Sequence, residues 1–354
     1  MTGTGTVLCA RDGRLVDIDV RDLVVDDWVA LSFAPASSAV ERVRLDDLDL
    51  SSPHGSQRRV WPPTVLDENL ALLLGMYASE GHTTRSNWTV HVTNSVPSVL
   101  ALCVELWRRC FGVAARGTSQ RDRCPTVVVS SKTIVEVLDS LGCGSRASQK
   151  RIPRVILDSP TDVATAFLQG LNLDAYTTAS SMKKWAICLD SPMLLDDLQS
   201  LLRTLGVVTS RISKRNKING KTYDEVYATG AHARRLLRMA PFLEPAKAAA
   251  AQRLLASPVD ARNNGADVVP LVHGTKLYAE IPKGCGGRTG GGTGVSLTWR
   301  SLCDKRTVWP SRDMVRRLSE AGHRLPRDVQ RVLDEDLYFL PVVSAAPSLQ
   351  GTLQ

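Results

Sequence analysis

The sequence predicts an α+β fold in which an αββαββα unit occurs twice. The two units begin with the apolar stretches 73–81 (LLGMYASEG) and 167–175 (FLQGLNLDA), which are expected to be helical. Each stretch contains a glycine and ends beside a carboxylate, Glu80 or Asp174. A glycine inside a helix costs about 1 kcal/mol relative to alanine, so close approach of two helix backbones is its expected use. Two helices packed at their glycines would bring the two acids together.

The residues that follow each helix also repeat, over about a hundred positions. A Thr-Thr pair, an alternating strand (88–94 or 184–190) and an amphipathic helix that begins at a proline occur in the same order. In the second unit, two strands flank Asn219-Gly220, a pair that favours a β-hairpin. Two unrelated core helices would explain each apolar stretch alone, but they would not explain this shared order.

The duplicated pattern resembles the LAGLIDADG homing endonucleases, in particular those carried inside inteins. Residues 150–153 (KRIP) resemble the Lys-x-Ile-Pro segment upstream of the family's second motif, and residues 191–211 resemble its helix-to-strand block. The resemblance covers residues 66 to 243. It implies a pseudo-twofold fold with a DNA-binding β-saddle, in a monomer that acts as an internal pseudo-dimer. The implied partner is double-stranded DNA with a long specific target site.

The length permits two or three domains, and the resemblance with the local composition divides the chain into six segments. Residues 22–31 resemble a strand–turn–strand of Hint splicing domains, although any small β element would show the same alternation. Residues 284–294 are glycine-rich and lack the Gly-Lys-[Ser/Thr] ending of a phosphate-binding loop, so a flexible insertion is expected there. The segments are a partial Hint-like β segment (1–33), a linker (34–64), the two LAGLIDADG halves (65–160 and 161–245), a helical and glycine-rich extension that is a candidate for DNA contact (246–336), and a partial Hint-like strand and tail (337–354).

The composition excludes some classes of protein and permits a nucleic-acid partner. The chain has 44 Lys+Arg against 36 Asp+Glu, a formal charge of +8, which suits a polyanion but does not require one. Eight cysteines without a Cys-x-x-Cys pair predict reduced thiols in a cytoplasmic protein rather than a zinc ribbon. No signal peptide or apolar run of about 18 residues is present, so neither secretion nor a membrane partner is expected.

The resemblance implies hydrolysis of phosphodiester bonds with Mg²⁺ (or Mn²⁺), for which carboxylates are suitable ligands. Glu80 and Asp174 are the candidate metal ligands and catalytic acids, one for each DNA strand, and Lys150 is the candidate basic residue near them. Two alignments of the repeats give different counterparts of Glu80, which lies five residues after Gly75. The position five residues after Gly170 is Ala175, whereas alignment on the Thr-Thr pair places Asp174 opposite Glu80. One residue is about 100° of helix, so the winding is expected to change at that helix end.

The candidate DNA-contacting residues are basic or histidine side chains on or near the predicted strands. A twisted antiparallel hairpin fits the major groove, where base edges are distinguishable. A solvated edge strand protected by lysines would have the same composition. The candidates are Arg85, His91, Arg121, Arg123, Lys183, Lys184, Arg211, Lys214, Arg215, Lys217 and Lys221.

The sequence therefore predicts an intein-derived homing endonuclease that makes a site-specific double-strand break in an intein-free allele. One alternative is a cleavage-deficient LAGLIDADG DNA-binding protein or nickase. A second is a protein-splicing element, against which the sequence argues because it shows no nucleophilic cysteine at position 1, no Thr-x-x-His block and no closing His-Asn.

Overall fold

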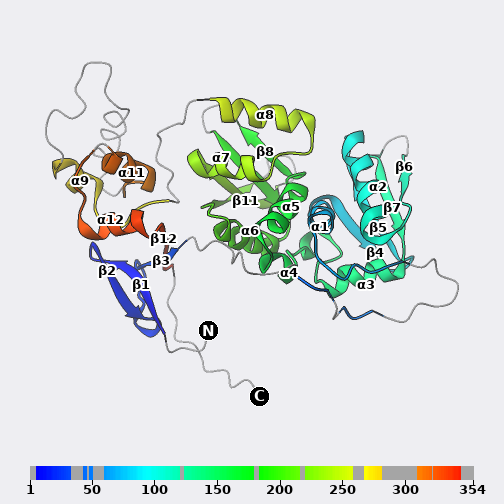
Figure 1. Ribbon diagram of the computed structural model, residues 1–354, viewed down its shortest axis with the longest axis horizontal. Helices are drawn as coiled ribbons and strands as arrows, with labels where there is room; N and C mark the ends of the chain where they lie inside the picture. Colours follow the sequence, from blue (N-terminus) through cyan, green and yellow to red (C-terminus); the bar gives the residue numbers. More distant parts are fainter. Residues whose placement is uncertain are drawn as a thin grey trace. The chain divides into compact units, whose positions relative to one another are not determined.

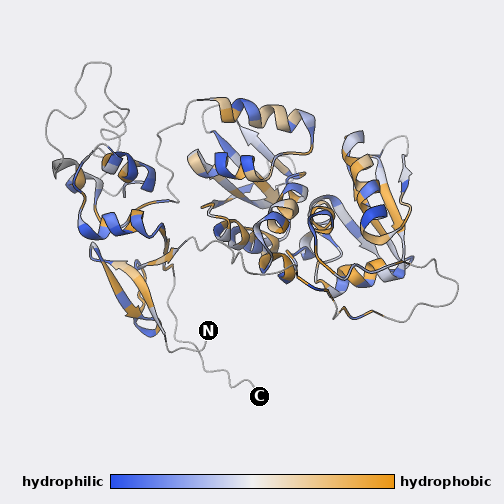
Figure 2. Cartoon of the chain, viewed as in Figure 1, coloured by the Kyte–Doolittle hydropathy of each residue, from blue (hydrophilic) through white to orange (hydrophobic). Residues whose placement is uncertain are grey.

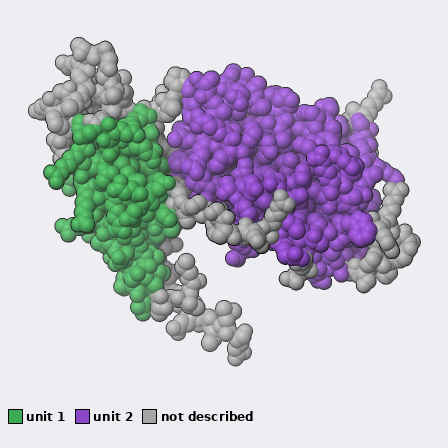
Figure 3. Space-filling view, viewed as in Figure 1, with its two compact units in different colours: residues 1–33, 260–354 green, residues 34–259 purple. Residues whose placement is uncertain are grey.

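The structure is a computed structural model that divides the chain into two compact units (Figure 3). Unit 1 combines Met1–Phe33 with Asp260–Gln354, and unit 2 is Ala34–Val259. The chain thus forms the first part of unit 1, then all of unit 2, and then completes unit 1. The described residues are 5–32, 43–45, 48–50, 60–119, 123–178, 183–215, 220–257, 267–280, 309–320 and 322–343.

Unit 2 contains the predicted αββαββα order twice, which confirms the α+β class and the duplication. The first half has α1 (Glu68–Glu80), β4 (Gly81–Thr84), β5 (Thr89–Thr93), α2 (Pro97–Phe111), β6 (Arg116–Thr118), β7 (Thr126–Ser130) and α3 (Lys132–Ser140). The second half has α5 (Thr161–Leu171), β8 (Ala175–Thr178), β9 (Lys184–Leu189), α6 (Pro192–Thr204), β10 (Ser210–Arg215), β11 (Thr222–Thr229) and α7 (Gly230–Met239). The short helices η2 (Ala147–Gln149) and α4 (Arg154–Leu157) connect the halves, and α8 (Pro245–Ala256) follows the second.

The two antiparallel sheets of unit 2 have the same topology. Sheet 1 has the strand order β4-β5-β7-β6, and sheet 2 has the corresponding order β8-β9-β11-β10. The predicted hairpin is the pair β10 and β11, in which Ser210 lies opposite Tyr227. Of the predicted Asn219-Gly220 turn, Asn219 lies outside the described residues, and Gly220 has a φ of 70°.

Helices α1 and α5 lie side by side (Figure 1) and approach each other at the two predicted glycines. A Cβ added to Gly75 would lie 2.0 Å from the carbonyl oxygen of Phe167. A Cβ added to Gly170 would lie 2.3 Å from the carbonyl oxygen of Leu72. Both distances are far shorter than a van der Waals contact, so a side chain at either position would force the helices apart. The expected close approach is therefore present.

Each sheet of unit 2 has an apolar face toward the helices and a polar face away from them. In sheet 1 the buried residues Val90, Val92, Val127 and Val129 alternate with more exposed ones, and Figure 2 shows β7 largely in orange. In sheet 2 the apolar face includes Trp185, Ile187 and Val226. The register places the following residues on the polar faces: His82, His91, Thr93, Arg116, Thr118 and Thr126 in sheet 1, and Tyr176, Lys184, Lys214, Glu225 and Tyr227 in sheet 2.

Unit 1 is a four-stranded antiparallel sheet with three α-helices and one short 3₁₀ helix among its described residues. Strand order is β12-β3-β1-β2, so that the last strand of the chain pairs with the third. The Asp12-Gly13 turn between β1 and β2 has φ angles of 49° and 78°, the left-handed values that a two-residue hairpin turn requires. The elements are β1 (Thr6–Arg11), β2 (Arg14–Asp19), η1 (Val20–Asp22), β3 (Trp28–Ser32), α9 (Gly274–Glu280), α11 (Arg312–Glu320), α12 (Arg327–Asp334) and β12 (Leu337–Pro341).

A buried arginine joins distant parts of unit 1. Arg312 donates from Nε to Asp267 at 3.1 Å and from Nη1 to Asp336 at 2.6 Å, and it also bonds the carbonyl oxygen of Leu337. Its side chain is 4% exposed, so these acceptors replace the water that the charge would otherwise require. The likeness of this unit to a Hint domain stays a prediction.

Two predicted segments differ from the structure in extent. Part of the predicted linker 34–64 packs in unit 2, because Leu45 donates its amide to Thr64 at 2.8 Å and is itself buried. The predicted extension 246–336 is divided, since α8 belongs to unit 2 and the rest to unit 1. The glycine-rich segment 284–294 lies outside the described residues.

Candidate functional site

The two predicted carboxylates come together at the ends of α1 and α5. Burial, and after it the negative charge of Asp174, raise the pKa of Glu80 to about 7. Burial also raises the pKa of Asp174 to about 6, against the lowering effects of the Ser79 hydroxyl and the Lys247 ammonium. Each acid therefore holds its proton more tightly than a solvated carboxyl, because the site is dehydrated and already negative.

The helical winding changes at the end of α5, as expected if Asp174 rather than Ala175 is the counterpart of Glu80. After Leu171, the amides of Leu173, Asp174 and Ala175 bond carbonyls three residues earlier, at 3.3, 3.2 and 3.1 Å. Such bonds belong to the tighter 3₁₀ geometry. Buried Asn172 supports the turn, because its Nδ2 donates to the carbonyl oxygen of Ala240 at 2.6 Å and its Oδ1 accepts from the indole of Trp185 at 3.0 Å. Glu80, by contrast, is the last residue of a regular helix.

Helix α8 supplies a cation that the sequence did not indicate. Lys247 donates to the carbonyl oxygen of Leu173 and pairs with Glu244 at 2.9 Å. The positive charge of Lys247 lowers the pKa of both Glu80 and Asp174, while Glu244 raises both. Lys247 lies outside the duplicated pattern, so no repeat pointed to it. The one available signal was Pro245, which marks the first turn of a helix.

Asn94 is a second contact that sequence reasoning missed. It follows β5, is buried, and donates from Nδ2 to Oε1 of Glu80 at 3.4 Å while its Oδ1 accepts from the amide of Val96 at 2.8 Å. This hydrogen bond lowers the pKa of Glu80 and orients its carboxylate. The corresponding residue after β9 is Asp190, which is exposed. The two acids therefore have different neighbours.

The structure does not bring Lys150 to the carboxylates. Lys150 is 1% exposed, and its Nζ lies 3.1 Å from the centroid of the Tyr77 ring. Within the described part of the chain this Nζ has no hydrogen-bond partner. Burial lowers the pKa of Lys150 to about 7. Tyr77 is fixed in turn, because its hydroxyl donates to the carbonyl oxygen of Gly144 at 2.8 Å.

Three candidate DNA-contacting cations of sheet 2 have acidic partners within the protein. Lys184 and Lys214 both bond the carboxylate of Glu225, the latter at 2.6 Å, and the hydroxyl of Tyr176 donates to the same group. Burial would raise the pKa of Glu225, but the hydrogen bonds from the two lysines outweigh it and hold that pKa below its usual value. Arg211 is held in the same way, by Asp224 at 2.6 Å and Asp196 at 2.5 Å.

The other candidates are dispersed over unit 2. Arg85 pairs with Asp139 at 2.8 Å, and exposed Arg215 donates to the carbonyl oxygen of Gly220 at 3.3 Å. His91 and Arg123 line a hollow on the polar face of sheet 1. Lys221 is exposed and Lys183 half-buried, whereas Arg121 and Lys217 lie outside the described residues.

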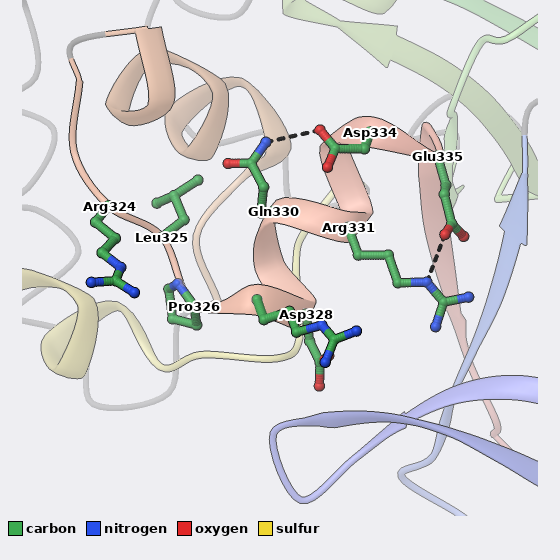
Figure 4. Close-up of a pocket in the computed structure, with 9 residues that line it drawn as sticks. Arg324, Leu325, Pro326, Asp328, Gln330, Arg331, Asp334 and Glu335 are labelled. Carbon is green, nitrogen blue, oxygen red and sulfur yellow. Dashed lines mark hydrogen bonds and ion pairs between the residues drawn. The ribbon is translucent and has the colours of Figure 1, made fainter.

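A separate hollow of about 960 Å³ runs along α12 in unit 1 (Figure 4). Arg331 pairs there with Glu335 at 2.7 Å, and Gln330 donates to Asp334 at 2.9 Å, as the dashed lines in Figure 4 show. Asp328 accepts from the amide of Leu15 at 3.1 Å. Charges of both signs line this hollow and several are paired, so it shows no preference for a ligand of either sign.

Comparison with known proteins identifies partial relatives, and no protein-family model matches the chain. The chain is 30% identical over 161 residues to a replication factor C small subunit of Methanocaldococcus jannaschii, a match to 44% of this chain and 8% of that protein. It is 32% identical over 156 residues to a DNA polymerase of Thermococcus kodakarensis, a match to 42% of this chain and 9% of that protein. The chain therefore spans only a small fraction of these relatives' length.

Two kinds of solved structure resemble the chain weakly. Full-length DUF199/WhiA from Thermatoga maritima has a TM-score of 0.38 and 13% identity, over 59% of this chain and 64% of that one. Mesophilic variants of the homing endonuclease I-DmoI give a TM-score of 0.38 and 17% identity, over 52% of this chain and 97% of theirs.

Proposed function

We propose that this chain is an intein-derived homing endonuclease that makes a site-specific double-strand break in DNA by Mg²⁺-dependent hydrolysis. The observation that carries the proposal is the convergence of Glu80 and Asp174 at the ends of two helices that meet at their glycines. The names of the partial relatives, a DNA polymerase and a replication factor C subunit, support a protein encoded within DNA-replication genes. The insertion of unit 2 between the two parts of unit 1 supports an endonuclease carried inside another domain.

The donor set at the site fits a divalent cation. Glu80 and Asp174 offer hard carboxylate oxygens, and Mg²⁺ is usually held by one or two carboxylates together with water and phosphate oxygens. Burial raises the pKa of both acids, and the charge of Asp174 raises that of Glu80 further, so a bound cation would favour their ionised forms. When bound, the ion would supply water activation and charge neutralisation at the scissile phosphate.

The protein's own residues would prepare this site in two ways. Asn94 orients the carboxylate of Glu80 through its hydrogen bond. Lys247 fixes the carbonyl oxygen of Leu173, and with it the turn that carries Asp174. The polar faces of sheets 1 and 2 would then contact the DNA, since twisted antiparallel strands fit the major groove.

A plasmid cleavage assay tests the proposal. The substrate is supercoiled plasmid bearing the uninterrupted sequence made by joining the two coding segments that flank this chain. We expect linear product with Mg²⁺ and none with EDTA. The same plasmid with a scrambled insert is the matched control, and equal cutting of both plasmids would contradict a site-specific enzyme.

The alternative of a nickase rests on the unequal ends of α1 and α5. Asp174 reaches the site only through the tightened turn after α5, whereas Glu80 ends a regular helix. Persistent open-circular product in the same assay would support this alternative. Specific binding without any cleavage would support a DNA-binding protein that has lost its activity.

A further inference from the structure

A hollow of about 380 Å³ lies on the polar face of sheet 1. His82 and His91 lie directly opposite each other on β4 and β5, and their rings stack with centroids 4.5 Å apart and planes 6° from parallel. The residues that line the hollow are His82, His91, Thr93, Thr118, Arg123, Cys124 and Thr126. They come from all four strands of sheet 1 and from the segment before β7.

Among the described residues that line this hollow there is no carboxylate that could occupy their donors. Thr93 and Thr126 bond each other at 3.0 Å, and Nε2 of His91 lies 2.9 Å from the hydroxyl of Thr89. A hydroxyl retains acceptor capacity in such a bond, and a neutral imidazole has one donor and one acceptor nitrogen. Burial lowers the pKa of His91 and so favours the neutral ring. Exposed Arg123 adds a planar set of donors.

On the polar face of sheet 2, by contrast, a carboxylate of the protein already occupies the cations. On this face Lys184 and Lys214 are bound to Glu225, which is 2% exposed. Arg211 lies on the other face of the sheet, because its register partner is Val226. Recruiting Lys184 or Lys214 to a base edge would remove one of the charged partners of buried Glu225, which is unfavourable. These cations can attract a phosphate backbone at a distance while staying paired, but they are poorly placed to discriminate base pairs.

We infer that the chain reads its DNA target unequally, with base pairs discriminated mainly by the hollow on sheet 1 and only weakly by sheet 2. The inference rests on the proposed function, since it assigns a division of labour within the DNA contact. The major groove presents a different set of donors, acceptors and methyl groups for each base pair. The hollow offers matching chemistry: imidazole nitrogens, threonine hydroxyls and methyls, and a guanidinium that can bond guanine through two hydrogen bonds.

The test is a series of duplexes, each with one base pair of the insertion-site sequence replaced, whose affinities are measured by fluorescence anisotropy without added metal. For the parent protein we expect penalties of about 10- to 100-fold at several positions of one half-site. Penalties in the other half-site should stay below about threefold. Similar penalties in both half-sites would overturn the inference.

Two variants test whether the hollow on sheet 1 reads the half-site with the large penalties, called the strong half-site below. Arg123→Ala, at an exposed position where folding is not at risk, should remove the discrimination at one or two positions of the strong half-site. His91→Ala should do the same at neighbouring positions. The matched control, Lys214→Ala on sheet 2, should weaken binding to every duplex by a similar factor. A uniform loss for Arg123→Ala and His91→Ala as well would contradict the assignment to the hollow.

The proposed function and this inference fail in different ways. No preference for the insertion-site sequence over random DNA would overturn the proposed function, and the inference with it. Specific binding with evenly distributed penalties, or with discrimination that depends on Lys214 rather than Arg123, would overturn the inference alone.

Discussion

The two halves of unit 2 have one topology and two different chemistries. Their strand orders correspond position by position, and both have valines or other large apolar residues on the core face. Their polar faces differ, with a stacked histidine pair in sheet 1 and a buried Glu225 with two lysines in sheet 2. Packing of helices on sheets requires only the apolar pattern, so the polar faces of a duplicated fold are free to diverge.

The same contrast is present at the acids. Glu80 is held by the buried amide of Asn94, whereas Asp174 follows a 3₁₀ turn that Asn172 and Lys247 support. Experiments should therefore decide whether Glu80 and Asp174 contribute equally to cleavage although their surroundings differ.

Glu80→Gln should lower the cleavage rate by more than about 100-fold, since even loss of groups that only support metal ligands costs 10- to 100-fold. The amide keeps the shape of the side chain and removes the anionic ligand. Single-turnover cleavage of supercoiled plasmid in Mg²⁺ measures the effect, and binding of the same DNA should remain within about threefold of the parent. Parental cleavage by this variant would remove Glu80 from the site.

Asp174→Asn should block cutting of one strand, so that open-circular plasmid accumulates in place of linear product. The physical reason is that in the proposed mechanism each acid serves one strand, and Asp174 follows the tightened turn after α5. A gel that resolves the supercoiled, nicked and linear forms measures this directly. If the parent produces linear plasmid and Asp174→Asn does so equally fast, the two ends are not equivalent and Asp174 has no catalytic part.

The acids of this site could be predicted from the sequence because local features mark them. A glycine inside an apolar helix signals a helix contact, and Glu80 and Asp174 are each close in sequence to such a glycine. The start of helix α2 is predictable as well, since Pro97 opens it, and Gly112 ends it with a φ of 67°. β6 was not singled out, because its three residues are all exposed and have no apolar alternation.

The rest of the site depends on contacts between segments that are distant in the chain. Lys247 reaches the end of α5 across 74 residues, and no local pattern records that contact. Lys150 belongs to a recognisable short segment, but its side chain turns into the core against Tyr77. A sequence motif thus identifies a lysine such as Lys150, but tertiary packing decides whether its ammonium group lies near the carboxylates.

Lys247→Met should move the acidic limb of the pH–rate profile to higher pH by up to about one unit. The proposed mechanism needs both carboxylates ionised, so activity should rise with pH as Glu80 and Asp174 lose their protons, near pKa values of about 7 and about 6. Removing the nearby positive charge raises both values, which shifts the rise to higher pH. Lys247→Arg keeps the charge and should restore the parental profile. A lower rate with an unmoved profile would limit Lys247 to a structural role.

The smallest expected effect concerns the polar face of sheet 2. Each phosphate contact made by a cation contributes close to one unit to the slope of log affinity against log salt. Lys214 is 47% exposed on its side chain yet is bound to Glu225, so it offers a phosphate part of its charge. Lys214→Ala should therefore make the slope shallower by about one unit or less, and Lys214→Ala with Lys217→Ala by about one to two. Lys214→Arg is the matched control, because it keeps both the charge and the partner. An unchanged slope in the double variant would mean that the DNA does not cross this hairpin, and the two halves would then differ in whether they contact DNA at all.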